Sequence, residues 1–257
     1  MRSIASEFSK EMDRVEAFLD AMITSYAVAK EDPKGIASRK RFVINARKLR
    51  KTIEGCSDLN VVAFAGAYLH VCAEYELTLR RLIETYIESA TLKCSQYHHL
   101  PKIMRDWYPV GCAELIRNIK QDKFKNLTIP NIVSSLASTT KNSKYNLIGE
   151  AFSDNQYNFN PILIDDVFSK RLGIIKIWQK LGREAGFQTA MRTKNPATVE
   201  QAAKGKLSTF LQRRNDTIHR GKSYYTPSES EVRNSIRFLK SFIENLAAVM
   251  EKQCSAL

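Results

Sequence analysis

Glycine and proline are scarce in this chain of 257 residues, which has Gly 10 and Pro 7. Both residue types interrupt helices and build turns, so their scarcity argues against a turn-rich sheet architecture and favours helices. Acidic residues are also few. The 27 Asp and Glu stand against 40 Lys and Arg, which leaves a formal net charge of +13. A positive excess of this size favours polyanionic partners, namely RNA, DNA or an anionic membrane surface.

The sequence also has few cysteines and no long apolar run. Its five cysteines are an odd, scattered set, which argues against a disulfide framework. The first twenty residues place acids and bases within their apolar periodicity, so they lack the continuous apolar core of a signal peptide. No uncharged apolar run approaches the length needed to span a bilayer. We therefore expect a cytoplasmic protein without a membrane association.

Apolar residues recur at three- and four-residue steps along most of the chain, and no strand-like alternation persists long enough to build a sheet. The predicted helices cover residues 5–28, 36–54, 58–93, 112–120, 130–138, 164–172, 173–194, 199–219 and a last stretch that Pro227 and Ser228 open. The longest, 58–93, is almost wholly apolar or small in its first half, so we expect that half to be buried. In 173–194 we expect these residues to face inward: Ile174, Ile175, Ile177, Trp178 and Leu181.

These helices predict an all-α bundle in which the long central helix 58–93 packs on two C-terminal helices. Residues 1–57 form an additional, basic N-terminal helical segment packed on the bundle. Residues 58–257 form the main helical domain, and the two are expected to make one compact unit.

The nine residues 213–221, RRNDTIHRG, concentrate charge near the end of the helix predicted over 199–219. In a purely structural interpretation the arginines complement the helix dipole, Gly221 caps the helix, and Asp216 pairs with Arg220 one turn on. In a functional interpretation this is a phosphate-handling site, because arginine presents a fork that matches phosphate oxygens. Spacing alone leaves both interpretations open.

The functional interpretation fits the chemistry of RNA cleavage. A base must take the proton from a ribose 2′-hydroxyl, an acid must protonate the leaving 5′-oxygen, and a cation must stabilise the charged transition state. His219 can perform either proton transfer, and Arg214 can supply the cation. Asn215 lies four residues before His219 and so shares its helix face. This chemistry requires no metal or other cofactor, and none is expected.

In this order and helix context, Arg214-Asn215-x3-His219 resembles the R-x4-6-H motif of HEPN domains. Residues 67–89, AYLHVCAEYELTLRRLIETYIES, resemble the long helix of that family, which carries an acidic residue in an apolar pattern; here that residue is Glu76. Residues 160–174, NPILIDDVFSKRLGI, resemble the segment before the motif in the RiboL-PSP-like branch. The resemblance covers most of 58–250 and is weakest in the middle.

The resemblance implies a HEPN-like helical bundle that forms a homodimer with a composite cleft. Many members are metal-independent endoribonucleases that act as bacterial toxins or antiviral effectors, and others are inactive binding modules. On this basis Arg214 would bind the scissile phosphate, Asn215 would orient the site and His219 would act as base or acid. Additional RNA contacts would come from Arg213, Arg220 and Lys222. Glu76 could support the site by a hydrogen bond to an arginine, but an ion pair with Arg80, four residues on, is the slightly favoured interpretation. An antitoxin or regulatory partner is a further expectation.

Three other groups of residues have alternative interpretations. Zinc ligation is the less favoured interpretation of Cys94, His98, His99 and Cys112, because no second close pair of ligands is present. Trp107 and Tyr108, with Arg105 nearby, could stack on unpaired bases, but core packing is favoured. The basic stretch 39–51 fits either a phosphate-tracking surface or a solvated helix face.

Two classes of function therefore stand beside each other. The first is a metal-independent endoribonuclease that leaves a cyclic phosphate and a 5′-hydroxyl. The second is a non-catalytic module that binds RNA or a partner protein. A nucleotide-binding or regulatory subunit is a weaker third. An enzyme requires both Arg214 and His219, whereas a binding module would tolerate His219→Ala.

Overall fold

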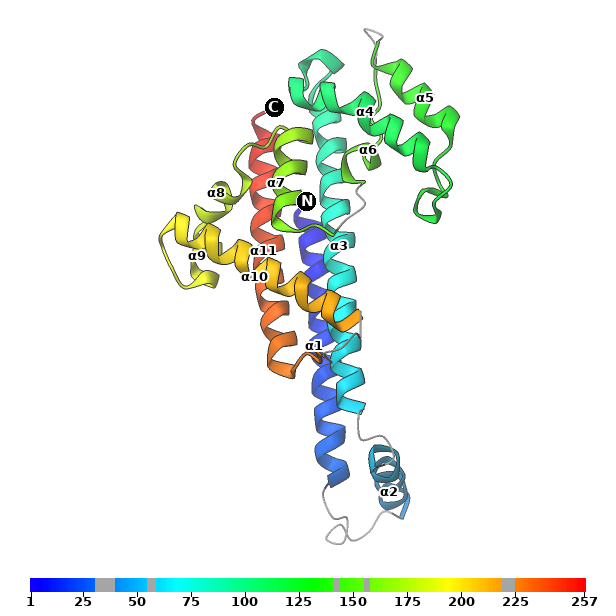
Figure 1. The fold of residues 1–257 in the computed structure, drawn as a ribbon, viewed down its shortest axis with the longest axis vertical. Coiled ribbons are helices and arrows are strands. Elements are labelled where there is room, and N and C mark those ends of the chain that lie inside the picture. Colours follow the sequence, from blue (N-terminus) through cyan, green and yellow to red (C-terminus); the bar gives the residue numbers. More distant parts are fainter. Residues whose placement is uncertain (31–39, 55–58, 141–143, 155–157, 219–224) are drawn as a thin grey trace.

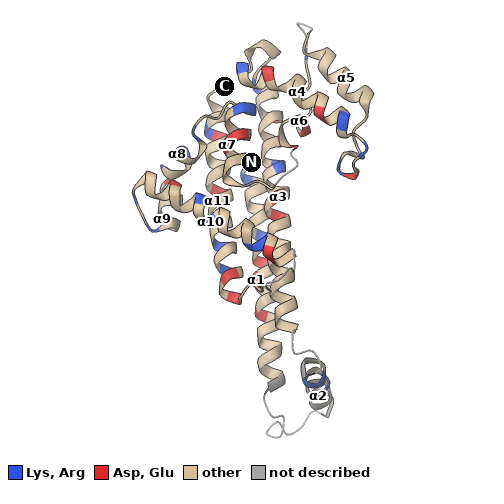
Figure 2. Ribbon diagram, viewed as in Figure 1, with Lys and Arg blue, Asp and Glu red and all other residues tan. Residues whose placement is uncertain are grey.

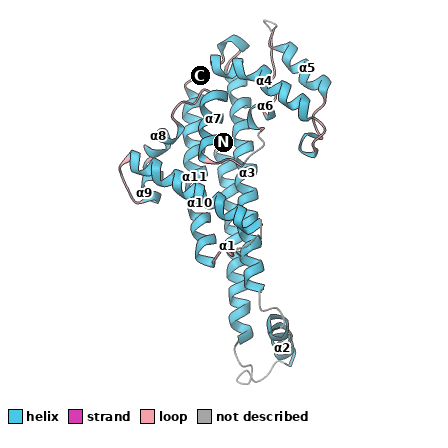
Figure 3. Cartoon of the chain, in the orientation of Figure 1, coloured by secondary structure: helices cyan, strands magenta, loops and turns pink. Residues whose placement is uncertain are grey.

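A computed structural model describes residues 1–30, 40–54, 59–140, 144–154, 158–218 and 225–257 of the chain (Figure 1). Within these ranges the regular structure is helical, and Figure 3 shows no strand in them. The α-helices are α1 (Arg2–Lys30), α2 (Lys40–Glu54), α3 (Leu59–Lys93), α4 (Lys102–Asn118), α5 (Ile129–Ser138), α6 (Glu150–Ser153), α7 (Pro161–Asp166), α8 (Ile177–Gly182), α9 (Ala185–Met191), α10 (Pro196–Ile218) and α11 (Glu229–Ser255). Short 3-10 turns η2 (Tyr97–His99) and η3 (Asp122–Phe124) and a π-turn η4 (Val167–Arg171) complete them. The all-α prediction is confirmed for the described residues.

Helix α3 runs through the middle of the bundle with α1 and α11 alongside it (Figure 1). Its side chains at three- and four-residue steps are buried from Tyr68 to Ala90. The ring of Tyr75 packs against Phe210 of α10 and Phe242 of α11, with centroids 5.9 and 6.4 Å away. The predicted packing of the long helix on the two C-terminal helices is therefore confirmed.

Helix α1 contributes to the same core as α3 and α11. Its buried residues are Ile4, Ala5, Phe8, Met12, Val15 and Leu19. Ion pairs also join α1 to α11, since Asp20 lies 2.5 Å from Arg233 and Asp13 lies 2.5 Å from Lys240. The N-terminal helix is thus an integral layer of the bundle.

Helix α11 begins at a capping box. The Ser228 hydroxyl accepts the backbone N–H of Glu231, and the Glu231 carboxylate accepts the backbone N–H of Ser228 at 2.8 Å. This exchange satisfies two of the orphan donors at the helix N-terminus. It fixes the start of the helix near the end of α10, at the position that the sequence predicts.

Two sequence-based expectations are wrong, one about the burial of α3 and one about the extent of a helix. The first half of α3 is not buried throughout, because Val61 is 40% exposed and Val62 is 58% exposed. Residues 173–194 are not one helix, because α8 and α9 are separate there and Lys176 and Arg192 have positive φ angles of 59° and 56°. A left-handed residue interrupts a helix, so the two segments are separate. Ile175, which was expected to face the core, is 58% exposed.

Candidate functional site

The candidate site lies where the C-terminal end of α10 crosses α3. Asn195 begins α10 by accepting the backbone N–H groups of Ala197 and Thr198 at 3.0 and 3.3 Å. Near the other end, the Tyr68 hydroxyl of α3 donates to the carbonyl oxygen of Phe210 at 2.9 Å, and their rings lie 5.3 Å apart. The contacts between Tyr68 and Phe210 hold α10 against α3 just before its last two turns, residues 211–218.

Arg214 and Asn215 lie in those last two turns, and both are half-buried. An Arg214 guanidinium nitrogen donates to Asn215 Oδ1 at 3.2 Å. Burial raises the pKa values of Cys72 and Glu76, which lie one turn apart on α3, and in both the positive charge of Arg214 opposes this rise. Arg214 is therefore on the α3 side of α10 and within electrostatic reach of a carboxyl group.

Glu76 is the acidic residue in the apolar pattern of α3. Burial raises its pKa from 4.5 to about 7, against the opposing effects of a backbone hydrogen bond and the charges of Arg80 and Arg214. The hydrogen bond comes from the backbone N–H of Phe159 to Glu76 Oε1, at 2.8 Å. Near neutral pH this carboxyl group thus exists in both protonation states, beside an arginine of the motif.

The segment around Phe159 is held by two consecutive residues of α3. Besides the bond to Glu76, the Tyr75 hydroxyl donates to the Phe159 carbonyl oxygen at 2.7 Å. Asn160 then caps α7 by accepting the backbone N–H of Leu163 at 2.9 Å. Tyr75, Phe159 and Cys72 were not predicted to lie in this region. The one signal in the sequence is that Cys72 lies one helical turn before Glu76 and so shares its helix face.

Arg213 faces other partners than Arg214 does. Its guanidinium lies 2.8 Å from a carboxylate oxygen of Glu231 on α11 and 5.8 Å from the ring centroid of Tyr225. Thr217 is buried and donates its hydroxyl to the Arg213 carbonyl oxygen at 2.8 Å. Of the predicted site residues, the structure thus brings Arg214, Asn215 and Glu76 together and places Arg213 in an ion pair with α11.

Three predicted site residues, His219, Arg220 and Lys222, lie outside the described residues. The described helix ends at Ile218, so His219 is the next residue along the chain. The roles assigned to these three residues remain predictions.

The other candidate groups have structural surroundings. Tyr108 is fully buried and stacks on Phe152 with centroids 5.7 Å apart, while Trp107 donates to the Ala151 carbonyl oxygen at 2.9 Å. The guanidinium of Arg171 covers the Trp107 ring at 4.5 Å. Core packing, the favoured interpretation of these two aromatic residues, is therefore confirmed.

No group of three His, Cys, Asp or Glu side chains suited to a metal ion occurs in the part of the chain that the structure describes. A search of the same residues found no helix with the length and apolar character of a membrane span. On α2, Arg47, Lys48, Arg50 and Lys51 are exposed, which leaves both interpretations of the basic stretch open.

Comparison with known families gives one match. The family model described as RiboL-PSP-HEPN matches residues 36–252, which include helices α2 to α10 and α11 as far as Lys252. Comparisons with curated proteins and with solved structures gave no match. A family match over most of the chain agrees with the all-helical bundle. The chain belongs to the RiboL-PSP-HEPN family.

Proposed function

We propose that the protein is a metal-independent endoribonuclease whose site is Arg214, Asn215 and His219. The observation that carries this proposal is the placement of Arg214 and Asn215. They form a half-buried, hydrogen-bonded pair near the end of α10, with Arg214 within electrostatic reach of the half-buried Glu76 and His219 four residues after Asn215. A family that includes ribonucleases supplies the setting.

In the proposed reaction, the ribose 2′-oxygen attacks the adjacent phosphorus while His219 or its counterpart takes the 2′-hydroxyl proton. The new O2′–P bond forms, the P–O5′ bond breaks, and the 5′-oxygen receives a proton from the second acid–base group. The products are a 2′,3′-cyclic phosphate and a 5′-hydroxyl. Arg214 stabilises the negative charge on the phosphorus-bound oxygens, and Asn215 orients the Arg214 guanidinium.

The proposal includes a homodimer, because one chain supplies one histidine and the reaction uses two proton-transfer groups. Support comes from an apolar stripe on α3. Its members recur at three- and four-residue steps and are exposed or half-exposed: Val62, Gly66, Leu69, Ala73 and Leu77. Leu77, which is 49% exposed, directly follows Glu76. A two-fold axis at this stripe would bring two motifs near each other, since each patch meets its own image.

The proposed biological role is that of a bacterial toxin or phage-defence effector, with an antitoxin or regulatory partner that restrains it. This part of the proposal rests on the family resemblance. The choice of RNA follows from the chemistry above and from the net charge of +13.

The test is to incubate the purified protein with total RNA and with tRNA in EDTA, beside the His219→Ala protein. The proposal predicts cleavage by the wild type only, with cyclic-phosphate ends. Binding of RNA without cleavage by either protein would favour a non-catalytic RNA-binding module. Equal cleavage by both proteins would place the chemistry elsewhere or reveal a contaminant.

A further inference from the structure

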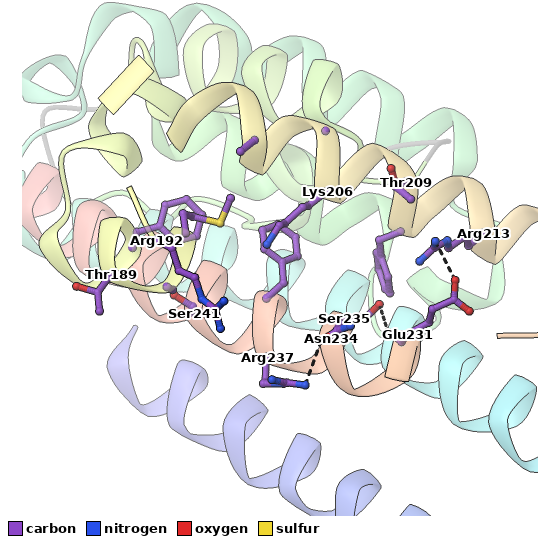
Figure 4. A pocket seen from close by; sticks show the side chains of 17 residues that line it. Thr189, Arg192, Lys206, Thr209, Arg213, Glu231, Asn234, Ser235, Arg237 and Ser241 are labelled. Carbon is purple, nitrogen blue, oxygen red and sulfur yellow. Dashed lines mark hydrogen bonds and ion pairs between the residues drawn. The ribbon is translucent and has the colours of Figure 1, made fainter. Parts of the chain in front are cut away.

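A groove of about 1040 Å³ lies between α9, α10 and α11 (Figure 4). Its wall on α10 runs from Ala202 to Arg213. Eleven residue steps of an α-helix correspond to about 16 Å. The groove therefore begins beside α9 and ends at the residue that precedes Arg214.

Three exposed cations line this groove: Arg192 after α9, Lys206 on α10 and Arg237 on α11. In Figure 4, Lys206 extends from α10, and Arg237 lies on α11 beside Asn234. None of the three forms an ion pair with another described residue. Glu231 is the acidic residue of the lining, and Arg213 already neutralises it at 2.8 Å.

The groove cations differ from neighbouring cations on the same helices, which have acidic partners. On α10, Lys204 lies 2.8 Å from Glu200, whereas Lys206 lies over the ring of Phe238, 5.9 Å from its centroid. On α11, Arg233 lies 2.8 Å from Glu229, whereas Arg237 donates to the neutral amide oxygen of Asn234 at 3.0 Å. Lys and Arg are spread over most helices (Figure 2). In the groove, three of them without acidic partners line one cavity and make it a positively charged site.

The size and shape of the groove favour an extended ligand. Pockets for small molecules measure about 300–1000 Å³, and this groove is at the upper limit of that range. Its cations come from three separate segments, so they line its length. The hydroxyl and amide groups of Thr209, Asn234 and Ser241 add hydrogen-bonding groups of the kind that contact phosphates and sugars.

We propose that this groove binds the single-stranded RNA that flanks the scissile bond, with Arg192, Lys206 and Arg237 contacting its phosphates. This inference rests on the proposed ribonuclease function. The groove ends at Arg213, the residue before Arg214, where the scissile phosphate would be held. The contacts are independent of base sequence, because they are made to the backbone.

The test compares two triple variants in a His219→Ala background, so that RNA stays intact during titration. The groove variant is Arg192→Gln, Lys206→Gln and Arg237→Gln. The matched control removes three charges from the region of α4, through Lys102→Gln, Arg117→Gln and Lys120→Gln; the three residues are exposed and form no ion pair with a described residue. Fluorescence anisotropy with a labelled, unstructured RNA measures Kd at several salt concentrations, and thermal unfolding checks that both variants are folded.

We expect the groove variant to raise Kd at least tenfold and to reduce the slope of log K against log salt by about 2, which corresponds to three lost phosphate contacts on a single strand. The control variant should change Kd by less than about twofold, since only non-specific charge is lost. Equal effects of the two variants on Kd and slope would overturn the inference. Competition by a mononucleotide as effective as competition by RNA would also overturn it, because the groove would then hold a compact phosphate ligand.

Failure of the inference can be told apart from failure of the proposed function. If wild-type protein cleaves RNA and the groove variant binds as the control does, the nuclease stands and the groove inference is wrong. If wild-type protein binds RNA through the groove without cleaving it, the groove inference stands and the proposed catalysis is wrong. If wild-type protein does not bind RNA, both are wrong.

Discussion

Arg213 and Arg214 are consecutive residues of the same type, yet α10 turns them toward different surroundings. Arg213 is neutralised by Glu231 of α11 at 2.8 Å, beside the ring of Tyr225. Arg214 faces α3, where burial raises the pKa of the half-buried Glu76 to about 7. The first arrangement joins two helices, whereas the second brings a guanidinium within electrostatic reach of a carboxyl group. Under the proposed function, the helical position of an arginine, rather than its presence in a basic motif, decides its role.

The largest effect on RNA cleavage should come from replacing Arg214, and replacing Arg213 should have a much smaller effect. Arg214→Ala should lower kcat/KM for RNA by about 10²–10³-fold, because a preorganised cation at the developing charge is lost. Arg214→Lys should also be impaired, since lysine lacks the planar fork. The matched variant Arg213→Ala should lose less than about tenfold, since this arginine is already neutralised by Glu231. Equal losses in the two alanine variants would break the distinction between the arginines.

A second large effect should follow from a charge on the α3 stripe beside Arg214. Leu77→Asp should convert the proposed dimer to monomers and reduce cleavage at least tenfold, because burying an unpaired carboxylate is costly. Leu92→Asp is the matched control on the same helix, since Leu92 is 86% exposed and lies outside the stripe. Sedimentation velocity and cleavage assays measure the two effects. A dimer that persists in Leu77→Asp would place the interface on another face.

A moderate effect should appear in the pH dependence of stability on the α3 side. Glu76 has a folded-state pKa of about 7, raised by burial from 4.5, so the folded state keeps a proton that the unfolded chain releases between these values. Wild-type stability should therefore fall as pH rises from about 4.5 to about 7, and Glu76→Gln should abolish this component. The stability advantage of Glu76→Gln should grow across that window and level off above it.

Thermal unfolding at pH 5, 6, 7 and 8 measures this prediction. The glutamine retains an oxygen that can accept the backbone N–H of Phe159. Glu88→Gln, at an exposed position of the same helix, is the control and should show no such trend. An advantage of Glu76→Gln that stays constant with pH would mean that Glu76 titrates normally and that its surroundings are wetter than described.

The smallest effect should come from the α11 side. Glu231→Ala removes the capping box of α11 and the ion pair to Arg213, and should destabilise the fold by about 1 kcal/mol. Burial acts to raise the pKa of Glu231, but hydrogen bonds from Ser228 outweigh it and lower the pKa below 4.5. The cost should therefore be complete above pH 4.5 and shrink as pH falls through the lowered pKa. Denaturant unfolding measures it, and Glu244→Ala, at an exposed position of α11, should have little effect.

The sequence predicted the long helices because helical periodicity is a local property. Helical periodicity placed α1, α3, α10 and α11 within a few residues of their ends, and the Ser228 capping box marked the start of α11. Glu76 was singled out as an acid in an apolar pattern, and the structure places it near Arg214.

Properties that depend on which segments meet were not predictable in this way. Apolar character alone predicted that the first half of α3 is buried, whereas Val62 is 58% exposed because no described segment covers it. Separate helices α8 and α9 depend on left-handed backbone at Lys176, which periodicity does not reveal. The groove cations Arg192, Lys206 and Arg237 come from distant parts of the chain, so only the packing of α9, α10 and α11 brings them together.

The proposed function is cleavage of RNA by 2′-hydroxyl attack at a site that contains Arg214 and His219. The most direct test is an RNA oligonucleotide with one mapped cleavage site, incubated in EDTA with wild-type and His219→Ala protein, beside the same oligonucleotide with a single 2′-deoxy sugar at that site. We predict that wild-type protein cuts only the all-ribose strand and leaves a cyclic phosphate, and that His219→Ala cuts neither. Cleavage of the 2′-deoxy strand at the same position would show that another nucleophile attacks the phosphorus, and it would contradict the mechanism.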